Sequence, residues 1–149
     1  MPSSDDTRPE DALQCAALPY RRGDRGELTF CLITSRGSRQ WLIPKGKPIA
    51  GLTSSETAAR EAYEEAGLIG HVTPEPIGRF AYIKDRGTRN ESYVAAVDVF
   101  AMEVTQQLTL WPEMGERQML WLDLDATLAA IEIKPLRKIV RVFADSDKT

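Results

Sequence analysis

The chain has 149 residues, of which 42% are hydrophobic, and a formal net charge of −3 at pH 7. This length and composition are typical of one globular domain with a buried core, and the acidic balance disfavours a broad nucleic-acid-binding surface while allowing a local basic pocket. No apolar run approaches the roughly 18–20 residues that a membrane-spanning helix needs.

The polar start of the chain, residues 1–10, has neither the basic region nor the apolar stretch of a secretory signal. We expect it to be a disordered lead to a single domain over residues 11–145. Two cysteines, Cys15 and Cys31, stand in apolar runs without the spacing of a metal-binding motif, which predicts buried free thiols in a reducing cytoplasm. The single histidine, His71, excludes a metal site built from several histidines.

Three short apolar runs open the domain. LQCAALPYR and LTFCLITSR are rich in residues that suit strands and are separated by the turn RGDRGE, and a third run, RQWLIP, ends at Pro44. A helix is predicted next, because Thr53 is a good N-cap and Glu56, three residues later, completes a capping box. Gly67 is placed to end this helix.

The second half of the chain predicts three more strands and two helices. PIGRFAYIK and SYVAAVDVFAMEV are joined by the basic hairpin DRGTRNE, and RQMLWLDL follows. Asp125 is the expected cap of a helix over ATLAAI, and Pro135 opens a last helix, PLRKIVRVFAD. Its apolar residues fall at helical spacing: Leu136, Ile139, Val140 and Phe143. This order indicates a mixed α/β (α+β) chain without βαβ repetition.

The faces of the central helix can be separated at about 100° per residue. The residues expected on its buried side share an arc of about 100°: Ala59, Ala62, Tyr63 and Ala66. Glu61 and Glu65 lie about 40° apart, roughly opposite these alanines. The stripe formed by Glu56, Arg60 and Glu64 contains two favourable i,i+4 contacts, and helix support alone explains it.

The remaining acids are costly to the helix. Glu61 meets Glu64 and Glu65 at i,i+3 and i,i+4 spacing, and each like-charge contact costs on the order of 0.2–0.5 kcal/mol. A solvated acidic face is the plain alternative, but a lysine at either place would remove the cost, and a preceding glycine turn can bring backbone carbonyls close. Three converging carboxylates form an oxygen-only site that suits Mg²⁺ or Mn²⁺ rather than Zn²⁺ or Cu²⁺. The pattern therefore indicates metal-assisted chemistry at a phosphate.

The segment from Gly46 to Leu68 resembles the Nudix box, G-x5-E-x7-R-E-U-x-E-E-x-G-U, in which U is an apolar residue. Seven positions match in register, with Ala62 as a small U: Gly46, Arg60, Glu61, Glu64, Glu65, Gly67 and Leu68. Leu52 departs from the box, because in the family this position holds a glutamate that supports the site and pairs with the box arginine. The resemblance implies a mixed, curved β-sheet sandwiched between helices.

The run WLIPKGKPIAGLTSSETAAREAYEEAG is also similar to the bacterial Nudix proteins grouped with diphosphoinositol polyphosphate and diadenosine polyphosphate hydrolases. The resemblance implies hydrolysis of a pyrophosphate bond in such a small molecule, by attack of water at phosphorus. It assigns Glu61, Glu64 and Glu65, together with the backbone carbonyl of Lys45, to the binding of Mg²⁺ or Mn²⁺.

The catalytic residues expected from the box are Arg60, Glu61 and Glu64, and Glu64 is the first candidate for the general base. An acid from a distal loop is the alternative in this family. The predicted loop LWPEMGERQ supplies two such acids, Glu113 and Glu116, although both also fit ordinary surface charge.

Substrate selection is expected from cations outside the acidic helix. Lys47 is the first choice for a phosphate contact and Lys45 the second. Further cations stand in two predicted loops: Arg36 and Arg39 before the WLIP run, and Lys84, Arg86 and Arg89 at the hairpin. Each alone fits a solvated loop cation. Together they favour a polyphosphate over a single sugar diphosphate, because arginine binds phosphate in bidentate geometry.

Two other functions stay open. The same chemistry could act on an RNA 5′ end, ADP-ribose or a nucleoside triphosphate, and an RNA end is the one nucleic-acid partner that we expect. A Nudix-fold binding module with weak catalysis is favoured by Leu52 alone, and three mutually repelling carboxylates argue against it. The sequence allows either a monomer or a homodimer.

Overall fold

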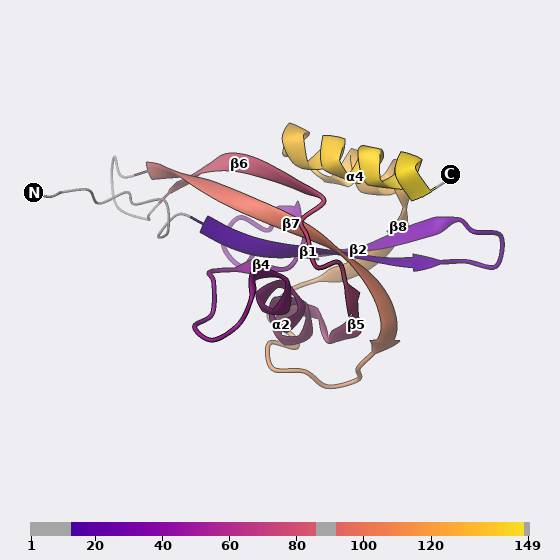
Figure 1. Ribbon diagram of the computed structural model, residues 1–149, viewed down its shortest axis with the longest axis horizontal. Coiled ribbons are helices and arrows are strands. Elements are labelled where there is room, and N and C mark those ends of the chain that lie inside the picture. The colour runs from indigo at the N-terminus through magenta and orange to yellow at the C-terminus, as the bar shows by residue number, and fades with distance from the viewer. Residues whose placement is uncertain (1–12, 86–91, 148–149) are drawn as a thin grey trace, which may run out of the picture.

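The computed structural model describes residues 13–85 and 92–147, so the expected lead over residues 1–10 lies outside the described part. Within these ranges the chain forms eight strands of one mixed sheet and three helices (Figure 1). The strands are β1 Leu13–Arg22, β2 Leu28–Thr34, β3 Trp41–Leu42, β4 Lys45–Gly46, β5 Leu68–Val72, β6 Gly78–Asp85, β7 Ser92–Gln107 and β8 Met119–Asp123. The helices are α2 Ser54–Ala66, α3 Leu124–Ala130 and α4 Lys134–Asp147. The mixed α+β class is confirmed.

Strand β1 lies at the centre of the sheet. It runs parallel to β7, from Leu13 opposite Ala96 to Tyr20 opposite Glu103, and antiparallel to β2 and β4. The other strand pairs in the described ranges, β2 with β3 and β8, and β7 with β5 and β6, are antiparallel. Residues 15–18 have no solvent exposure. This explains the continuous apolar run, because a strand covered on both faces does not alternate with polar residues.

The two faces of the sheet carry separate cores. Alternate residues of β1 supply them: Ala16 and Leu18 join the core shared with α4, whereas Cys15 and Ala17 join the core under α2. In Figure 1, α2 and α4 accordingly lie on opposite sides of the sheet, which confirms a sheet between helices. No helix in the described ranges is long and apolar enough to cross a membrane.

Helix α2 has the predicted ends but a different buried face. Thr53 Oγ1 accepts from the Glu56 backbone N–H at 3.1 Å, the Glu56 carboxylate accepts from the Thr53 N–H at 2.8 Å, and Gly67 ends the helix with φ 68°. The buried residues are Thr57, Ala58, Ala62, Glu65 and Ala66. The predicted face is confirmed at Ala62 and Ala66 and was wrong elsewhere, because Glu65 lies on the buried side while Ala59 and Tyr63 are only half-buried.

Several smaller expectations are settled by the same structure. Cys15 and Cys31 are buried free thiols, and burial raises the pKa of Cys31 to about 12. The expected cap at Asp125 was wrong: Asp123 caps α3, accepting from the Ala126 N–H at 2.8 Å. Strands β4 and β5 were not predicted, because neither carries enough alternation of apolar and polar residues. Strand β4 has only two residues, directly after a proline, and β5 has five, directly after the glycine that ends α2.

Candidate active site

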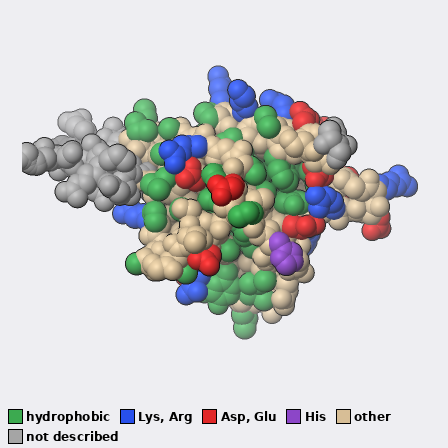
Figure 2. All heavy atoms as spheres, viewed as in Figure 1, with side chains coloured by type: hydrophobic (Ala, Val, Ile, Leu, Met, Phe, Trp, Pro, Cys, Tyr) green, Lys and Arg blue, Asp and Glu red, His purple; other side chains and the backbone are tan. Residues whose placement is uncertain are grey.

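A pocket of about 730 Å³ lies where β4, the buried face of α2 and the stretch before β8 meet. Three glutamates line it: Glu61, Glu65 and Glu113. Four cations line it as well: Arg36, Lys45, Lys47 and Arg117. Acidic and basic groups thus share one cavity, whereas the face drawn in Figure 2 shows small separate groups of both signs rather than one broad basic surface.

Gly46 brings the backbone of β4 against the acidic helix. Strand β4 pairs with β1 at Cys15 and Ala16, which fixes its position at the centre of the sheet. A Cβ atom added to Gly46 would lie 2.4–2.7 Å from the carboxyl atoms of Glu61. Glycine is required here because the Glu61 carboxylate fills the space of a side chain.

Glu61 and Glu65 lie together in the pocket as neighbouring acids. Only 8% of the Glu65 side chain is exposed, and its Oε1 accepts from the Lys45 backbone N–H at 3.3 Å. Burial, and then the neighbouring Glu61, raise the pKa of Glu65 to about 8, and burial also raises the pKa of Glu61. Two buried carboxylates side by side repel each other unless a proton or a cation lies with them.

Glu64 lies apart from this pair. Its Oε2 accepts from Arg60 Nε at 3.0 Å, and neither residue lines the pocket. Arg60 thus pairs with Glu64, one of its two i,i+4 neighbours in the stripe described from the sequence. Among the described residues, no group of three or more His, Cys, Asp or Glu side chains is arranged to hold a metal ion, so ligation by the three box glutamates stays a prediction.

The Glu61–Glu65 pair nevertheless fits a hard divalent cation. Its donors are carboxylate oxygens, which Mg²⁺ and Mn²⁺ prefer, and a cation would relieve their repulsion. The close approach of Gly46 leaves the backbone of β4 beside them.

The stretch between β7 and β8, residues 108–118, is attached to the end of α2. The Leu108 N–H donates to the Gly67 carbonyl at 2.8 Å, and the Glu113 N–H donates to the Glu64 carbonyl at 2.9 Å. A Cβ atom on Gly67 would lie 2.4 Å from the Trp111 ring, so the ring sits directly on the helix end. Two backbone hydrogen bonds and a ring contact thus tie this stretch to the C-terminal end of the acidic helix.

The two loop acids predicted from the sequence have different surroundings. Glu113 lines the pocket and its Oε1 accepts from Arg117 Nη2 at 3.0 Å. Glu116 is not among the lining residues, and its carboxylate pairs with Arg36 at 2.9 Å on the surface.

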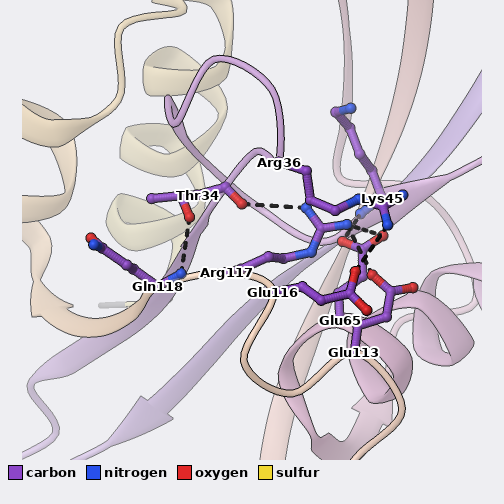
Figure 3. A network of polar contacts seen from close by, with 8 residues as sticks. All are labelled: Thr34, Arg36, Lys45, Glu65, Glu113, Glu116, Arg117 and Gln118. Atoms are coloured by element: carbon purple, nitrogen blue, oxygen red, sulfur yellow. Dashed lines mark hydrogen bonds and ion pairs between the residues drawn. The ribbon is translucent and has the colours of Figure 1, made fainter.

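Sequence reasoning missed Arg117. Its side chain is 11% exposed, lines the pocket, and contacts Glu113 and Glu65 (Figure 3). A single arginine just before a strand gives no signal in the sequence, since its role depends on three segments that meet only in the fold.

The predicted substrate-binding cations fall into three groups. Lys45, Lys47 and Arg36 line the pocket. Arg39 is exposed, with φ 59°, and is not among the lining residues. The others lie outside what the structure describes: the Lys84 side chain, Arg86 and Arg89.

Lys45 is held by an aromatic neighbour. Its Nζ atom lies 5.3 Å from the centroid of the Tyr82 ring, a cation–π distance, and the Tyr82 hydroxyl donates to Gln14 Oε1 at 3.0 Å. Tyr82 and Gln14 also line the pocket, so the lysine is positioned by the cavity wall.

Comparison with solved structures supports the fold. The E. coli dihydroneopterin triphosphate pyrophosphohydrolase aligns with a TM-score of 0.69 at 15% identity, covering 93% of this chain and 97% of that chain. The C. elegans Ap4A hydrolase aligns with a TM-score of 0.64 at 16% identity, covering 90% of this chain and 96% of that chain. At these identities the likeness shows the fold alone.

Sequence comparison identifies the family. Nudix hydrolase 17, mitochondrial, from Arabidopsis thaliana is 36% identical over 98 residues, which cover 65% of this chain and 50% of that protein. The chain spans between 50% and 63% of the length of the first curated relatives that it matches. The model of the NUDIX domain matches residues 13–143. The chain therefore belongs to the NUDIX domain family.

Proposed function

We propose that the protein is a Mg²⁺-dependent hydrolase that cleaves a pyrophosphate bond in a polyphosphorylated small molecule, by attack of water at phosphorus. One observation carries this proposal: a single pocket holds Glu61 and the buried Glu65 together with Lys45, Lys47 and Arg36, three of its four cations. Cations that contact phosphoryl oxygens stabilise the charge that spreads over them in the transition state.

Glu61 and Glu65 would hold the metal, with Glu64 and the Lys45 backbone carbonyl as the further ligands predicted from the sequence. When bound, Mg²⁺ or Mn²⁺ polarises the phosphate and lowers the pKa of an attacking water. Glu64 remains the candidate general base from the box. Among the loop acids the geometry supports Glu113 over Glu116, because Glu113 lines the pocket, whereas Glu116 does not and is paired with Arg36.

The proposed substrate is a diadenosine polyphosphate or a diphosphoinositol polyphosphate. Three of the lining cations, Lys45, Lys47 and Arg36, support a chain of several phosphates, since each can neutralise a separate phosphate group. The fold itself does not choose among substrates, because it is shared with proteins named for Ap4A and for dihydroneopterin triphosphate.

The test is a substrate panel with purified protein and either Mg²⁺ or Mn²⁺. The panel contains diadenosine polyphosphates, inositol pyrophosphates, ADP-ribose, nucleoside triphosphates and capped RNA. We expect turnover of the first or second class, its complete loss in excess EDTA, and a fall of at least about 100-fold in Glu65→Gln, since a metal ligand is removed. Tight binding of one compound without turnover of any would instead identify a binding module.

A further inference from the structure

Arg117 is held at the base of the pocket by three contacts with different segments. Its Nη1 donates to the Thr34 carbonyl at the end of β2 at 3.3 Å, and its Nη2 donates to Glu113 Oε1 at 3.0 Å. The same Nη2 lies 3.7 Å from Glu65 Oε2. The neighbouring Gln118 is bonded twice to Thr34, which fixes the backbone that carries the arginine.

These contacts close a ring between the acidic helix and the following stretch, as Figure 3 shows for its side chains. The Glu113 backbone is bonded to the Glu64 carbonyl, the Glu113 carboxylate to Arg117, and Arg117 pairs with Glu65, the residue next to Glu64. Glu65 is 8% exposed, Arg117 11% and Glu113 24%, so solvent screens these charges far less than surface pairs. The ring therefore sets where the Glu65 carboxylate lies relative to Glu113.

We propose that Arg117 is a positioning residue that preforms the metal site, acting through Glu65 and Glu113 rather than on the substrate. The inference rests on the proposed function, because it assigns the metal to the Glu61–Glu65 pair. Arg117 contacts the proposed ligand Glu65 as an ion pair at 3.7 Å. Residues that hold metal ligands from the outer shell fix their orientation, and their loss typically weakens metal affinity by about 10- to 100-fold. The residue that holds the proposed ligand Glu65 thus lies more than fifty residues beyond the end of the acidic helix.

The direction of the change in metal affinity distinguishes a positioning role of Arg117 from a purely electrostatic one. Removal of a positive charge near a cation site strengthens cation binding by Coulomb's law, whereas removal of a positioning residue weakens it. Arg117→Met keeps the length of the side chain and removes the guanidinium. Arg117→Lys keeps the charge but loses the fork that contacts Thr34, Glu113 and Glu65 together.

The experiment is a Mn²⁺ titration of the substrate-free protein, followed by electron paramagnetic resonance of free Mn²⁺. We expect Arg117→Met to raise the dissociation constant by about 10- to 100-fold and Arg117→Lys by a smaller factor. The matched control is Arg22→Met, which removes an arginine that pairs with Glu103 at 2.8 Å elsewhere in the molecule. Its dissociation constant for Mn²⁺ should stay within about twofold of the wild-type value. Circular dichroism establishes that each variant is folded.

An unchanged or tighter dissociation constant in folded Arg117→Met overturns the inference, as does an equal loss in Arg22→Met. If Arg117→Met does not fold, Arg117→Lys decides alone, and wild-type affinity in that variant overturns it. Combining Glu113→Gln with each Arg117 substitution gives a double-mutant cycle. If the residues act in one ring, their losses of Mn²⁺ affinity are not additive, whereas the losses of independent groups add. Wild-type protein that binds Mn²⁺ but hydrolyses nothing refutes the proposed function and leaves the role of Arg117 standing.

Discussion

At the scale of single residues, the glycines around the acidic helix are explained by what occupies the space of their missing side chains. Gly46 faces the Glu61 carboxylate, and Gly67 faces the Trp111 ring. At Gly46 the contact is with the flexible end of a side chain. At Gly67 it is with a large ring, and the backbone of Gly67 itself has a φ of 68°. A side chain at Gly46 should therefore reduce mainly activity, whereas a side chain at Gly67 should reduce mainly the stability of the fold.

Gly46→Ala is expected to reduce activity while leaving the fold nearly as stable. The new methyl group displaces the Glu61 carboxylate, a proposed metal ligand, whereas the backbone need not move because only the end of a flexible side chain must give way. We expect kcat/KM to fall by at least about 10-fold and the free energy of unfolding to change by less than about 1 kcal/mol.

Gly23→Ala is the matched control, because a Cβ atom there would meet the Glu27 carboxyl group at 2.0–2.9 Å in the turn between β1 and β2. It displaces a glutamate in the same way but in another part of the molecule. Comparable loss of activity in both variants, measured on the same substrate, would contradict the assignment of Glu61 to the site.

At the scale of elements, local signals predicted the ends of α2 and missed its surroundings. Thr53, Glu56 and Gly67 act through contacts within one helix, so a single sequence contains them. The buried face was predicted correctly at Ala62 and Ala66 but not at Glu65, because periodicity assumes that acids point to solvent, whereas Glu65 lines the pocket and contacts the distant Arg117. Strand β4 exists only because β1 lies beside it, and nothing in Lys45 and Gly46 themselves reveals that pairing.

The attachment of residues 108–118 to α2 leads to a prediction about stability. Gly67→Ala must adopt a left-handed conformation, which costs roughly 1–2 kcal/mol, and must displace the Trp111 ring, with an overpacking cost of roughly 1–3 kcal/mol. We expect the free energy of unfolding to fall by about 2–5 kcal/mol, the sum of these two costs, measured by urea denaturation.

Gly26→Ala separates these two costs. Gly26 has φ 81° and nothing within 4 Å of its Cβ position, so only the conformational cost remains. A loss of about 1–2 kcal/mol is expected there. If Gly67→Ala cost no more than Gly26→Ala, the Trp111 contact would be too loose to anchor the stretch.

At the scale of the whole molecule, the pocket combines side chains that are far apart in the sequence. The acids of the helix were singled out by their unusual spacing, and the family followed from the same spacing, although only Glu61 and Glu65 among them line the pocket. Arg117 was not predictable, and neither was the separation of Arg36 from Arg39 or of Glu113 from Glu116, because each depends on how distant segments meet. A cation in a loop acquires a function only from the cavity that the fold builds around it.

The lining cations give a prediction about the length of the substrate. Lys47 lines the pocket beside Lys45, so Lys47→Ala should weaken binding mainly by removing an attraction to phosphate. A longer polyphosphate extends over more of the lining cations than a short one, and more of its binding energy is electrostatic. We expect KM to rise by about 10-fold on a substrate with four or more phosphates and by less on one with two, while kcat changes little.

Ionic strength distinguishes this effect from a structural one. Attraction between the pocket and a polyanion weakens as salt screens it, so log KM should rise with log salt concentration, less steeply in Lys47→Ala than in the wild type. Arg25→Ala removes a cation from the exposed turn between β1 and β2, away from the pocket lining, and should leave both KM and the salt slope unchanged. Equal increases in KM on long and short substrates, or an unchanged salt slope in Lys47→Ala, would show that the lysine does not bind phosphate, and the preference for a polyphosphate would lose its physical basis.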